Sequence, residues 1–271
     1  MTRTYALAVA AAVLVCAQQP VSAQVLQQQV LEQQDLTQQQ PSPGNWSVTL
    51  GAGLGTGPVY PGANTDRLRA IPLAQIVYDK TLFAGTEGLG LNLINSHGFR
   101  AGPLLSYIGG RNQDSDPRLS GLGDIHASLT AGVFASYRVG RIEFRATVRQ
   151  AVTQTDNGLL GLVQVDYLMP LIRKKTLITF GPDLEFANAR YDQTWFGVTG
   201  SQSLSSGLPM FSPGAGVRDV GVHATLTHRY TEHFILRAFV SAKEITGDDA
   251  NSPLIENRTQ VLFGVGLAYH F

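Results

Sequence analysis

Two histidines occur in patterns that could support nucleophilic catalysis. His126 stands two residues before Ser128, and His223 is followed at the same spacing by Thr225 and then Thr227. Hydrolysis by a nucleophile needs a hydroxyl, a histidine and an orienting acid within hydrogen-bond reach. Neighbours at i and i+2 of a strand lie roughly 6.5–7 Å apart, and no acid is placed by the spacing. We therefore expect no catalytic residues, and a lipid hydrolase is the weakest hypothesis.

Side chains that could bind ions are dispersed along the chain. None of the six histidines has a chelating partner at a ligand-like spacing. Asp248-Asp249 and the pair Asp114 and Asp116 could contact divalent cations, or could be solvated loop charges. The only cysteine, Cys16, lies in an apolar stretch near the N-terminus. We expect neither a metal nor a cofactor, and the balanced charge gives no reason to expect a nucleic-acid partner.

The elements that must position these residues are strands with a period of two. Trp46, Val48 and Leu50 share one face of the first such segment, opposite Ser47 and Thr49. The pattern continues in runs longer than the strands of a soluble sandwich, and it matches tilted strands of about 9–11 residues that span a bilayer. After the N-terminal stretch no run of 18 apolar residues occurs, which excludes a helical membrane protein. The pattern predicts an all-β, transmembrane, antiparallel β-barrel.

The last segment carries the alternation to the end of the chain. Tyr269 and Phe271 place two aromatic rings on its apolar face. Such an ending resembles the signal read by the assembly machinery of the bacterial outer membrane, and it suits the aromatic girdle of such barrels. We therefore interpret Tyr269 and Phe271 as a barrel-assembly signal. The expected location is the outer membrane of a Gram-negative bacterium, in contact with lipid and lipopolysaccharide.

The first 45 residues have a different character. Arg3, the apolar residues 5–17 and the small residues Val21 and Ala23 form a secretion signal that we expect to be cleaved after residue 23, with an uncleaved anchor as the alternative. Residues 24–45 are rich in glutamine and are interpreted as a short, disordered periplasmic segment, or alternatively as a partner-binding helix. The predicted organisation is a signal peptide (1–23), a Gln-rich linker (24–45) and a barrel (46–271).

Twelve strands are predicted, with ten as the alternative because the third and fourth are short. Connections 57–65, 109–122, 191–213 and 247–257 are long and polar, as expected of outer loops, whereas those at 79–80, 95–96, 139–140 and 231–232 are short, as expected of periplasmic turns. The predicted strands are 46–56, 66–78, 81–86, 88–94, 97–108, 123–138, 141–153, 158–169, 176–190, 214–230, 233–246 and 258–271.

Charged residues within strands are expected to face the lumen, because a charge facing lipid at mid-bilayer costs about 2–4 kcal/mol. The predicted lumen-facing residues are Arg67, Arg69, Arg138, Glu143, Arg145, Arg149, Asp166 and Arg237. This set is richer in arginine than in carboxylate, so it indicates either a salt-bridged plug or an anion-preferring channel. Tyr191, Trp195 and Phe196 form an aromatic group in an outer loop, to be read as an interfacial girdle or as part of a ligand site.

A series of short motifs resembles the MipA/OmpV family of outer-membrane proteins over about Trp46 to Phe271. Each motif is weak alone, but their order and spacing are specific, and the Gln-rich segment is outside the pattern. The motifs are Tyr60-Pro-Gly-Ala-Asn64, Ile71-Pro-Leu73, Gly121-Leu-Gly-Asp-Ile125, Arg145-Ala-Thr-Val-Arg-Gln150, Tyr191-Asp-Gln-Thr-Trp-Phe-Gly-Val198, Ser206-Gly-Leu-Pro209, Gly214-Ala-Gly-Val-Arg-Asp219 and Ser252-Pro-Leu-Ile-Glu256.

The resemblance implies a non-enzymatic protein, because the family has no catalytic motif to carry over. Its name-giving member is regarded as a scaffold that joins a murein lytic transglycosylase to a murein-synthesising penicillin-binding protein. The expected contact surface is periplasmic: the turn Leu171–Lys175 and the Gln-rich segment. The alternative function is a narrow pore or a small-molecule-binding protein.

Overall fold

The computed structural model describes residues 46–271, apart from residues 87 and 173–174. The predicted signal peptide (1–23) and Gln-rich linker (24–45) lie outside these residues, as do Arg173 and Lys174 of the predicted contact turn. The described strands are β1 (Trp46–Pro58), β2 (Asp66–Tyr78), β3 (Leu82–Gly85), β4 (Gly88–Leu91), β5 (Ile94–Ser96), β6 (Phe99–Ile108), β7 (Ser128–Val139), β8 (Ile142–Ala151), β9 (Leu159–Leu171), β10 (Thr176–Ala187), β11 (Gly216–Arg229), β12 (Phe234–Ile245) and β13 (Thr259–His270).

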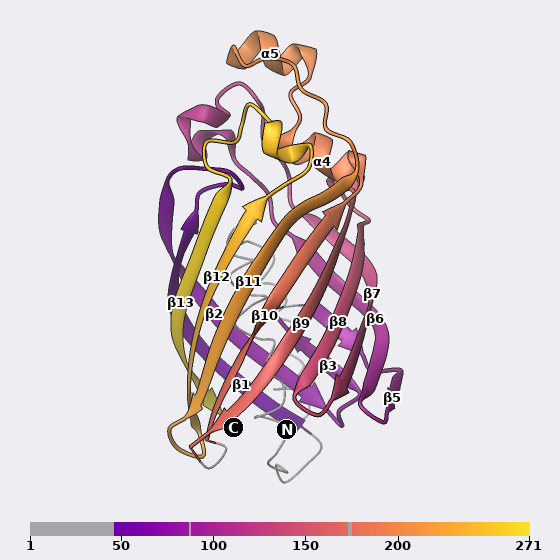
Figure 1. Cartoon of the computed structure of the whole chain (residues 1–271), viewed down its shortest axis with the longest axis vertical. Coiled ribbons are helices and arrows are strands. Elements are labelled where there is room, and N and C mark those ends of the chain that lie inside the picture. The colour runs from indigo at the N-terminus through magenta and orange to yellow at the C-terminus, as the bar shows by residue number, and fades with distance from the viewer. Residues whose placement is uncertain (1–45, 87, 173–174) are drawn as a thin grey trace.

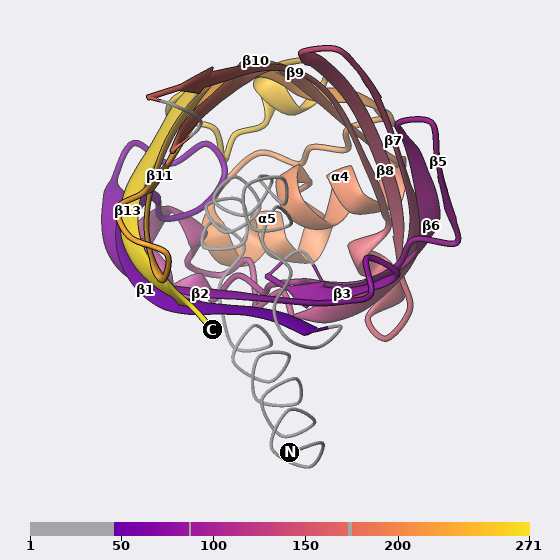
Figure 2. The same ribbon diagram turned by 90° about the horizontal axis from the view of Figure 1, so that it is seen from below.

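The sheet closes on itself as a barrel (Figures 1 and 2). Neighbouring strands pair antiparallel, β1 pairs with β13, and β4 pairs with β6. Because β4 and β5 pair with successive parts of the same edge of β6, they occupy one strand position. The barrel therefore has twelve strands, and this prediction is confirmed. The segments 81–86 and 88–94 do join the wall, although β3 and β4 have only 4 residues each.

Two predicted strand boundaries were wrong for local reasons. The strand expected from residue 123 begins at Ser128, because the positive φ of 78° at Gly123 belongs to a turn and not to an extended chain. The strand expected to reach residue 190 ends at Ala187. There the side chain of Asn188 accepts a hydrogen bond from the Tyr191 amide and starts a helix.

The two faces of the barrel wall differ in polarity. Large apolar side chains point outward and are exposed, as expected of a surface that contacts lipid; among them are Leu54, Leu105, Val133, Phe144, Val163, Val222, Val240 and Val265. The inward face carries most of the buried polar and charged residues. Within the described ranges, helices are too short or too polar to cross a bilayer.

Packed loops cover one end of the barrel, opposite the end of β13 (Figure 1). Helix α4 (Ala189–Phe196) packs against residues at the outer ends of strands, including Ile108, Leu160 and Ile245. A second buried cluster joins Tyr60 and Leu119 to Val198 and Leu254, from four different loops; helix α5 (Gly200–Ser206) follows Val198. We call α4, α5 and these two clusters the outer lid.

Candidate functional site

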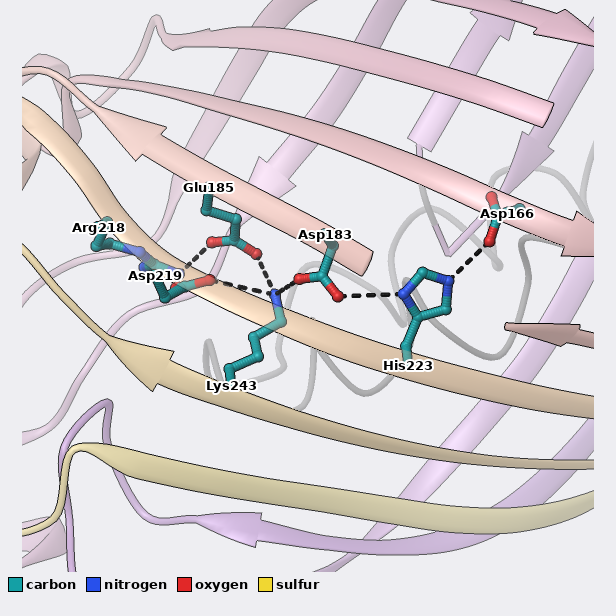
Figure 3. A network of polar contacts seen from close by, with 7 residues as sticks. All are labelled: Asp166, Asp183, Glu185, Arg218, Asp219, His223 and Lys243. Atoms are coloured by element: carbon teal, nitrogen blue, oxygen red, sulfur yellow. Dashed lines mark hydrogen bonds and ion pairs between the residues drawn. The ribbon is translucent and has the colours of Figure 1, made fainter. Parts of the chain in front are cut away.

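Ion-paired side chains cross the lumen face of five neighbouring strands, β8 to β12, and continue to β6. Figure 3 shows the part of this network on β9 to β12. Lys243 of β12 lies at the centre of the outer part of this network. Its Nζ is 2.6 Å from Glu185, 3.1 Å from Asp183 and 3.6 Å from Asp219. Arg218 pairs with Glu185 and lies 2.6 Å from Asp219. Two cations thus pair with three buried carboxylates.

A β-bulge lets neighbouring residues of β11 reach the same network. The register between β10 and β11 shifts at Glu185/Phe186, so that Glu185 faces Asp219 whereas Phe186 faces Val217. Arg218 is the additional residue. A bulge re-aims one side chain, and here both Arg218 and Asp219 are buried and bonded to each other.

His223 continues the network toward the periplasmic half of the barrel. Its Nδ1 lies 3.1 Å from Asp183, and its Nε2 lies 2.8 Å from Asp166. Asp166 in turn lies 3.7 Å from Arg145, which lies 3.2 Å from Glu143. Glu143 also accepts a hydrogen bond of 2.8 Å from Arg100 of β6. Acids and bases alternate along this path, so most charges have a partner of opposite sign.

The predicted lumen-facing residues fall into two groups. Glu143, Arg145 and Asp166 belong to the network, whereas Arg149 donates to Ser106 and Arg237 to Gln75. Two others bond to backbone carbonyl oxygens near the outer end: Arg67 donates to the Ser115 carbonyl, and Arg69 donates to the carbonyls of Pro58 and Val59. Arg138 is half-buried and lies opposite Glu143 in the ladder of β7 and β8. The expectation had not included Arg100, Asp183, Glu185, Arg218, Asp219, His223 and Lys243. The network is therefore not weighted toward arginine.

The outer aromatic group is part of the outer lid. Tyr191, Trp195 and Phe196 lie on α4, and each is at most 2% exposed. Arg111 lies over the Trp195 ring and donates to its carbonyl oxygen, and Arg218 donates to the Tyr191 hydroxyl. The interfacial-girdle interpretation does not hold, because girdle residues would face lipid. These rings instead connect the lid to the charged network.

The histidine motifs do not form a nucleophilic triad. Ser128 Oγ donates to the Leu129 carbonyl and contacts Thr153, and His126 precedes the strand. His223 lies opposite Ser241 in the ladder of β11 and β12, but Ser241 Oγ has no hydrogen-bond partner among the described residues. Both nitrogens of the His223 ring face carboxylates. Within the described ranges, no group of three or more His, Cys, Asp or Glu side chains is arranged to hold a metal ion.

Gly221 makes room for the network, which gives a testable prediction. A Cβ at Gly221 would lie 2.7 Å from Lys243 Cγ and 3.0 Å from the Ala242 carbonyl oxygen. We expect Gly221→Ala to lower the free energy of unfolding by about 1–3 kcal/mol, the usual cost of overpacking. Refolding into liposomes at a series of urea concentrations measures this free energy of unfolding. Gly216→Ala, where a Cβ would meet nothing within 4 Å, is the matched control, and equal stability of the two variants would contradict the prediction.

Two buried carboxylates from different loops meet in the outer lid. Asp192 lies on α4, and Asp249 lies in the connection between β12 and β13; they are 2% and 3% exposed. Burial, followed by the charge of Asp192, raises the pKa of Asp249 to about 8, with Asp248 adding to the rise and Arg218 opposing it. Burial also raises the pKa of Asp192. Asp249, expected in a solvated acidic pair, is therefore neither solvated nor fully ionised at neutral pH.

This carboxyl pair predicts that the barrel loses stability as the pH rises. A raised pKa means that the folded state favours the neutral acid, so the stabilisation is complete below about pH 4 and is lost as the pH rises through about 8. We expect the thermal unfolding midpoint to fall between pH 5 and pH 9, and to fall less in Asp249→Asn. Asp114→Asn, at an exposed loop acid, should behave as the parent chain. If the unfolding midpoint of Asp249→Asn fell with pH as much as that of the parent chain, Asp249 would not be the source of the pH dependence.

A cavity of about 640 Å³ lies beside the outer lid, within the range of small-molecule sites. Most of the residues that line it have polar side chains, and three of them are charged: Asp124, Asp156 and Arg190. Residues that line it include Asp124, His126, Gln154, Asn157, Arg190, Gln193, Thr194 and Gln202. Gln202 donates to the Leu122 carbonyl and Asn157 to the His126 carbonyl, so part of this polar surface serves the lid itself.

The chain is similar to several solved structures of outer-membrane proteins, at low sequence identity. No curated protein matches it. Among solved structures, an outer membrane channel from Pseudomonas putida F1 is 11% identical over 85% of this chain and 96% of that chain, with a TM-score of 0.43. The translocator domain of the autotransporter NalP from Neisseria meningitidis is 10% identical over 90% and 94%, with a TM-score of 0.42. OprB from Pseudomonas putida is 12% identical, with a TM-score of 0.40, and the match covers 74% of this chain and 59% of OprB.

A match between this sequence and a protein-family model shows the family to which the chain belongs. The family model described as MltA-interacting protein MipA matches residues 50–271, which is the whole barrel apart from the first residues of β1. The closed barrel with an apolar outer face agrees with the outer-membrane location of such proteins. This chain is therefore an outer-membrane β-barrel protein that belongs to the MltA-interacting protein family.

Proposed function

We propose that this barrel is a non-enzymatic scaffold for murein enzymes at the periplasmic face of the outer membrane. Its partners would be a murein lytic transglycosylase and a murein-synthesising penicillin-binding protein. The observation that carries the proposal is the match to the MltA-interacting family over residues 50–271. The chain would be exported with a signal peptide, residues 1–23, that is then cleaved. The barrel-assembly machinery would recognise Tyr269 and Phe271 and insert the chain into the outer membrane.

The charge of the periplasmic turns supports a docking role. Lys80, Arg141 and Lys175 are exposed at that end of the barrel, together with His97. The acids of the same turns are fewer, namely Asp79 and Glu232 among the described residues. Complementary charge raises the rate of encounter and suppresses incorrect partners. The proposed partner surface is therefore acidic, and the Gln-rich linker would add to the contact.

In-cell crosslinking followed by mass spectrometry tests this proposal. The tagged protein should recover a lytic transglycosylase or a penicillin-binding protein above the level of an unrelated barrel. A variant with Lys80→Glu, Arg141→Glu and Lys175→Glu should recover less, whereas Arg190→Glu at the opposite end should leave recovery unchanged. Recovery of only assembly factors and lipopolysaccharide by the parent protein would overturn the scaffold proposal.

A narrow pore or small-molecule-binding protein is the second candidate. The 640 Å³ cavity beside the outer lid favours a small-molecule-binding protein, because most of its lining residues have polar side chains. The ion-paired network favours neither anions nor a wide passage, because Lys243 and Arg218 are each bonded to carboxylates. Charged groups that neutralise one another offer little attraction to a passing ion. The scaffold is therefore the better-supported function.

A further inference from the structure

A groove of about 410 Å³ lies on the outer surface of the barrel wall, over β8 to β11. Its volume is within the range of small-molecule sites. Asp166 and His223 line it from the strands of the floor, and their side chains belong to the ion-paired network of the lumen. The other side chains that line it face outward, and four of them are 37–59% exposed. The outward-facing set is Ile142, Val165, Tyr167, Phe180, Pro182 and Val222.

An interruption in the pairing of β9 and β10 lies beneath this groove. Tyr167 pairs with Phe180 and Gln164 pairs with Asp183 in one register, but the two residues between them on each strand are outside the ladder. Pro182 has no amide hydrogen to donate there. A Cβ at Gly181 would lie 1.7 Å from the Val165 carbonyl oxygen, so the strands can approach this closely only at glycine. The compact ring of Pro182 then leaves space beside the larger Phe180 ring.

The groove runs from the periplasmic boundary of the wall to its middle. Ile142 is the first residue of β8, directly after a periplasmic turn. Phe180 is the fifth residue of β10, which starts at the next periplasmic turn. Val222 is the seventh of the 14 residues of β11. In the membrane these levels correspond to the hydrocarbon of the periplasmic leaflet.

Positive charge stands at the periplasmic end of the groove. The Arg141 side chain is exposed, and its Nη1 lies 3.5 Å from the hydroxyl oxygen of Tyr167. The Tyr167 ring in turn packs against Phe180, with the ring centroids 5.5 Å apart. Lys175 is exposed in the neighbouring turn, and the described residues of these two turns include no acid. The groove therefore has an apolar body and a cationic end.

A phospholipid has the same order of chemistry, with a phosphate at the membrane boundary and acyl chains in the hydrocarbon. The guanidinium group of arginine matches the geometry of a phosphate and binds it through two parallel hydrogen bonds. We propose that the groove binds one anionic phospholipid of the periplasmic leaflet, with its phosphate on Arg141 and one acyl chain along Phe180 and Val222. This binding site is independent of the scaffold function.

Native mass spectrometry of the refolded full chain tests this proposal. The chain is mixed in a non-ionic detergent with equal amounts of dioleoylphosphatidylglycerol, which is anionic, and dioleoylphosphatidylcholine, which is zwitterionic. Val222→Trp fills the groove, and Val265→Trp on β13 is its matched control, because both valines face lipid, at 59% and 52% exposed, and Val265 does not line the groove. Arg141→Gln removes the cation, with Lys80→Gln at another periplasmic turn as control.

The parent chain should bind the phosphatidylglycerol about threefold more than the phosphatidylcholine, the scale of an exposed ion pair. This preference should disappear in Arg141→Gln and remain in Lys80→Gln. Val222→Trp should lose the bound lipid, whereas Val265→Trp should keep it. Equal lipid binding by the two tryptophan variants, an unchanged preference in Arg141→Gln, or a lipid-free dimer of the parent chain would each overturn the proposal.

The same variants separate lipid binding from the scaffold function. Because position 222 lies outside the periplasmic turns, Val222→Trp should recover murein enzymes on crosslinking as the parent chain does, even though it has lost the lipid. Folding of each variant is checked by its heat-dependent mobility on gels. If Val222→Trp does not fold, Val222→Phe carries the same expectation, and lipid binding equal to that of Val265→Trp would likewise overturn the proposal.

Discussion

Replacing Lys243 with methionine should lower the free energy of unfolding by about 3–5 kcal/mol, the usual cost of breaking a buried ion pair from one side. The Lys243 ammonium lies within 3.6 Å of Glu185, Asp183 and Asp219. Among the described residues, Arg218 forms ion pairs with Glu185 and Asp219 but not with Asp183. Asp183 would therefore keep His223 as its remaining partner there. Methionine preserves most of the volume and removes only the charge, which separates electrostatics from packing.

Urea-dependent refolding into liposomes measures this loss, with Lys80→Met at an exposed periplasmic turn as the matched control. The double variant Lys243→Met, Glu185→Gln removes one charge of each sign and should recover part of the stability. A Lys243→Met barrel as stable as the parent would show that the network contributes little. If the double variant recovered no stability, the stability lost in Lys243→Met would come from packing and not from charge.

Trp195→Ala is expected to open the outer lid. The Trp195 side chain is 2% exposed and packs with Tyr191 and with Arg111. Truncation of a buried tryptophan usually costs about 3–5 kcal/mol. Because α4 belongs to a loop connection, we expect this cost to appear as local opening, with the barrel wall intact.

Hydrogen exchange of the α4 amides measures the opening of the lid. Exchange should accelerate across residues 189–196 in Trp195→Ala, while amides in the paired strands β11 and β12 keep their protection. Leu204→Ala on α5 is the control, because the Leu204 side chain is 90% exposed and its removal leaves no cavity. Unchanged exchange in α4 would show that the tryptophan does not hold the lid.

The barrel could be predicted because alternation depends on one physical period that the chain repeats in every strand. The number of twelve strands came from counting the alternating segments, and the alternation of long and short connections agreed with that count. The position of helix α4 in a packed lid could not be predicted in the same way. Its apolar residues Tyr191, Trp195 and Phe196 suit a membrane girdle as well as a lid, and only the contacts with Ile108 and Ile245 separate the two.

Part of the charged network was also within reach of the sequence. Asp183 and Glu185 share a strand face with Thr179, and Lys243 shares one with Arg237, so the parity that selected Arg237 applies to them. Arg218 was not within reach. An alternating strand would place Arg218 and Asp219 on opposite faces, and only the bulge at Glu185/Phe186 brings both into the lumen.

The role of the hairpin of β3 and β4 could be anticipated only as a doubt about strand number. The shortness of segments 81–86 and 88–94 raised the ten-strand alternative, but the sequence does not show that arms of 4 residues can close the ring. That arrangement depends on long-range pairing of β4 with β6, which local patterns do not encode.

Planar-bilayer recording tests most directly the claim that this barrel is a scaffold with an ion-paired lumen and a packed outer lid. The purified full chain should insert without single-channel current steps, while a known porin prepared in the same way conducts. A steady, anion-selective current from the parent chain, lost in Arg145→Gln, would contradict the claim. It would instead establish the pore as the function of the barrel.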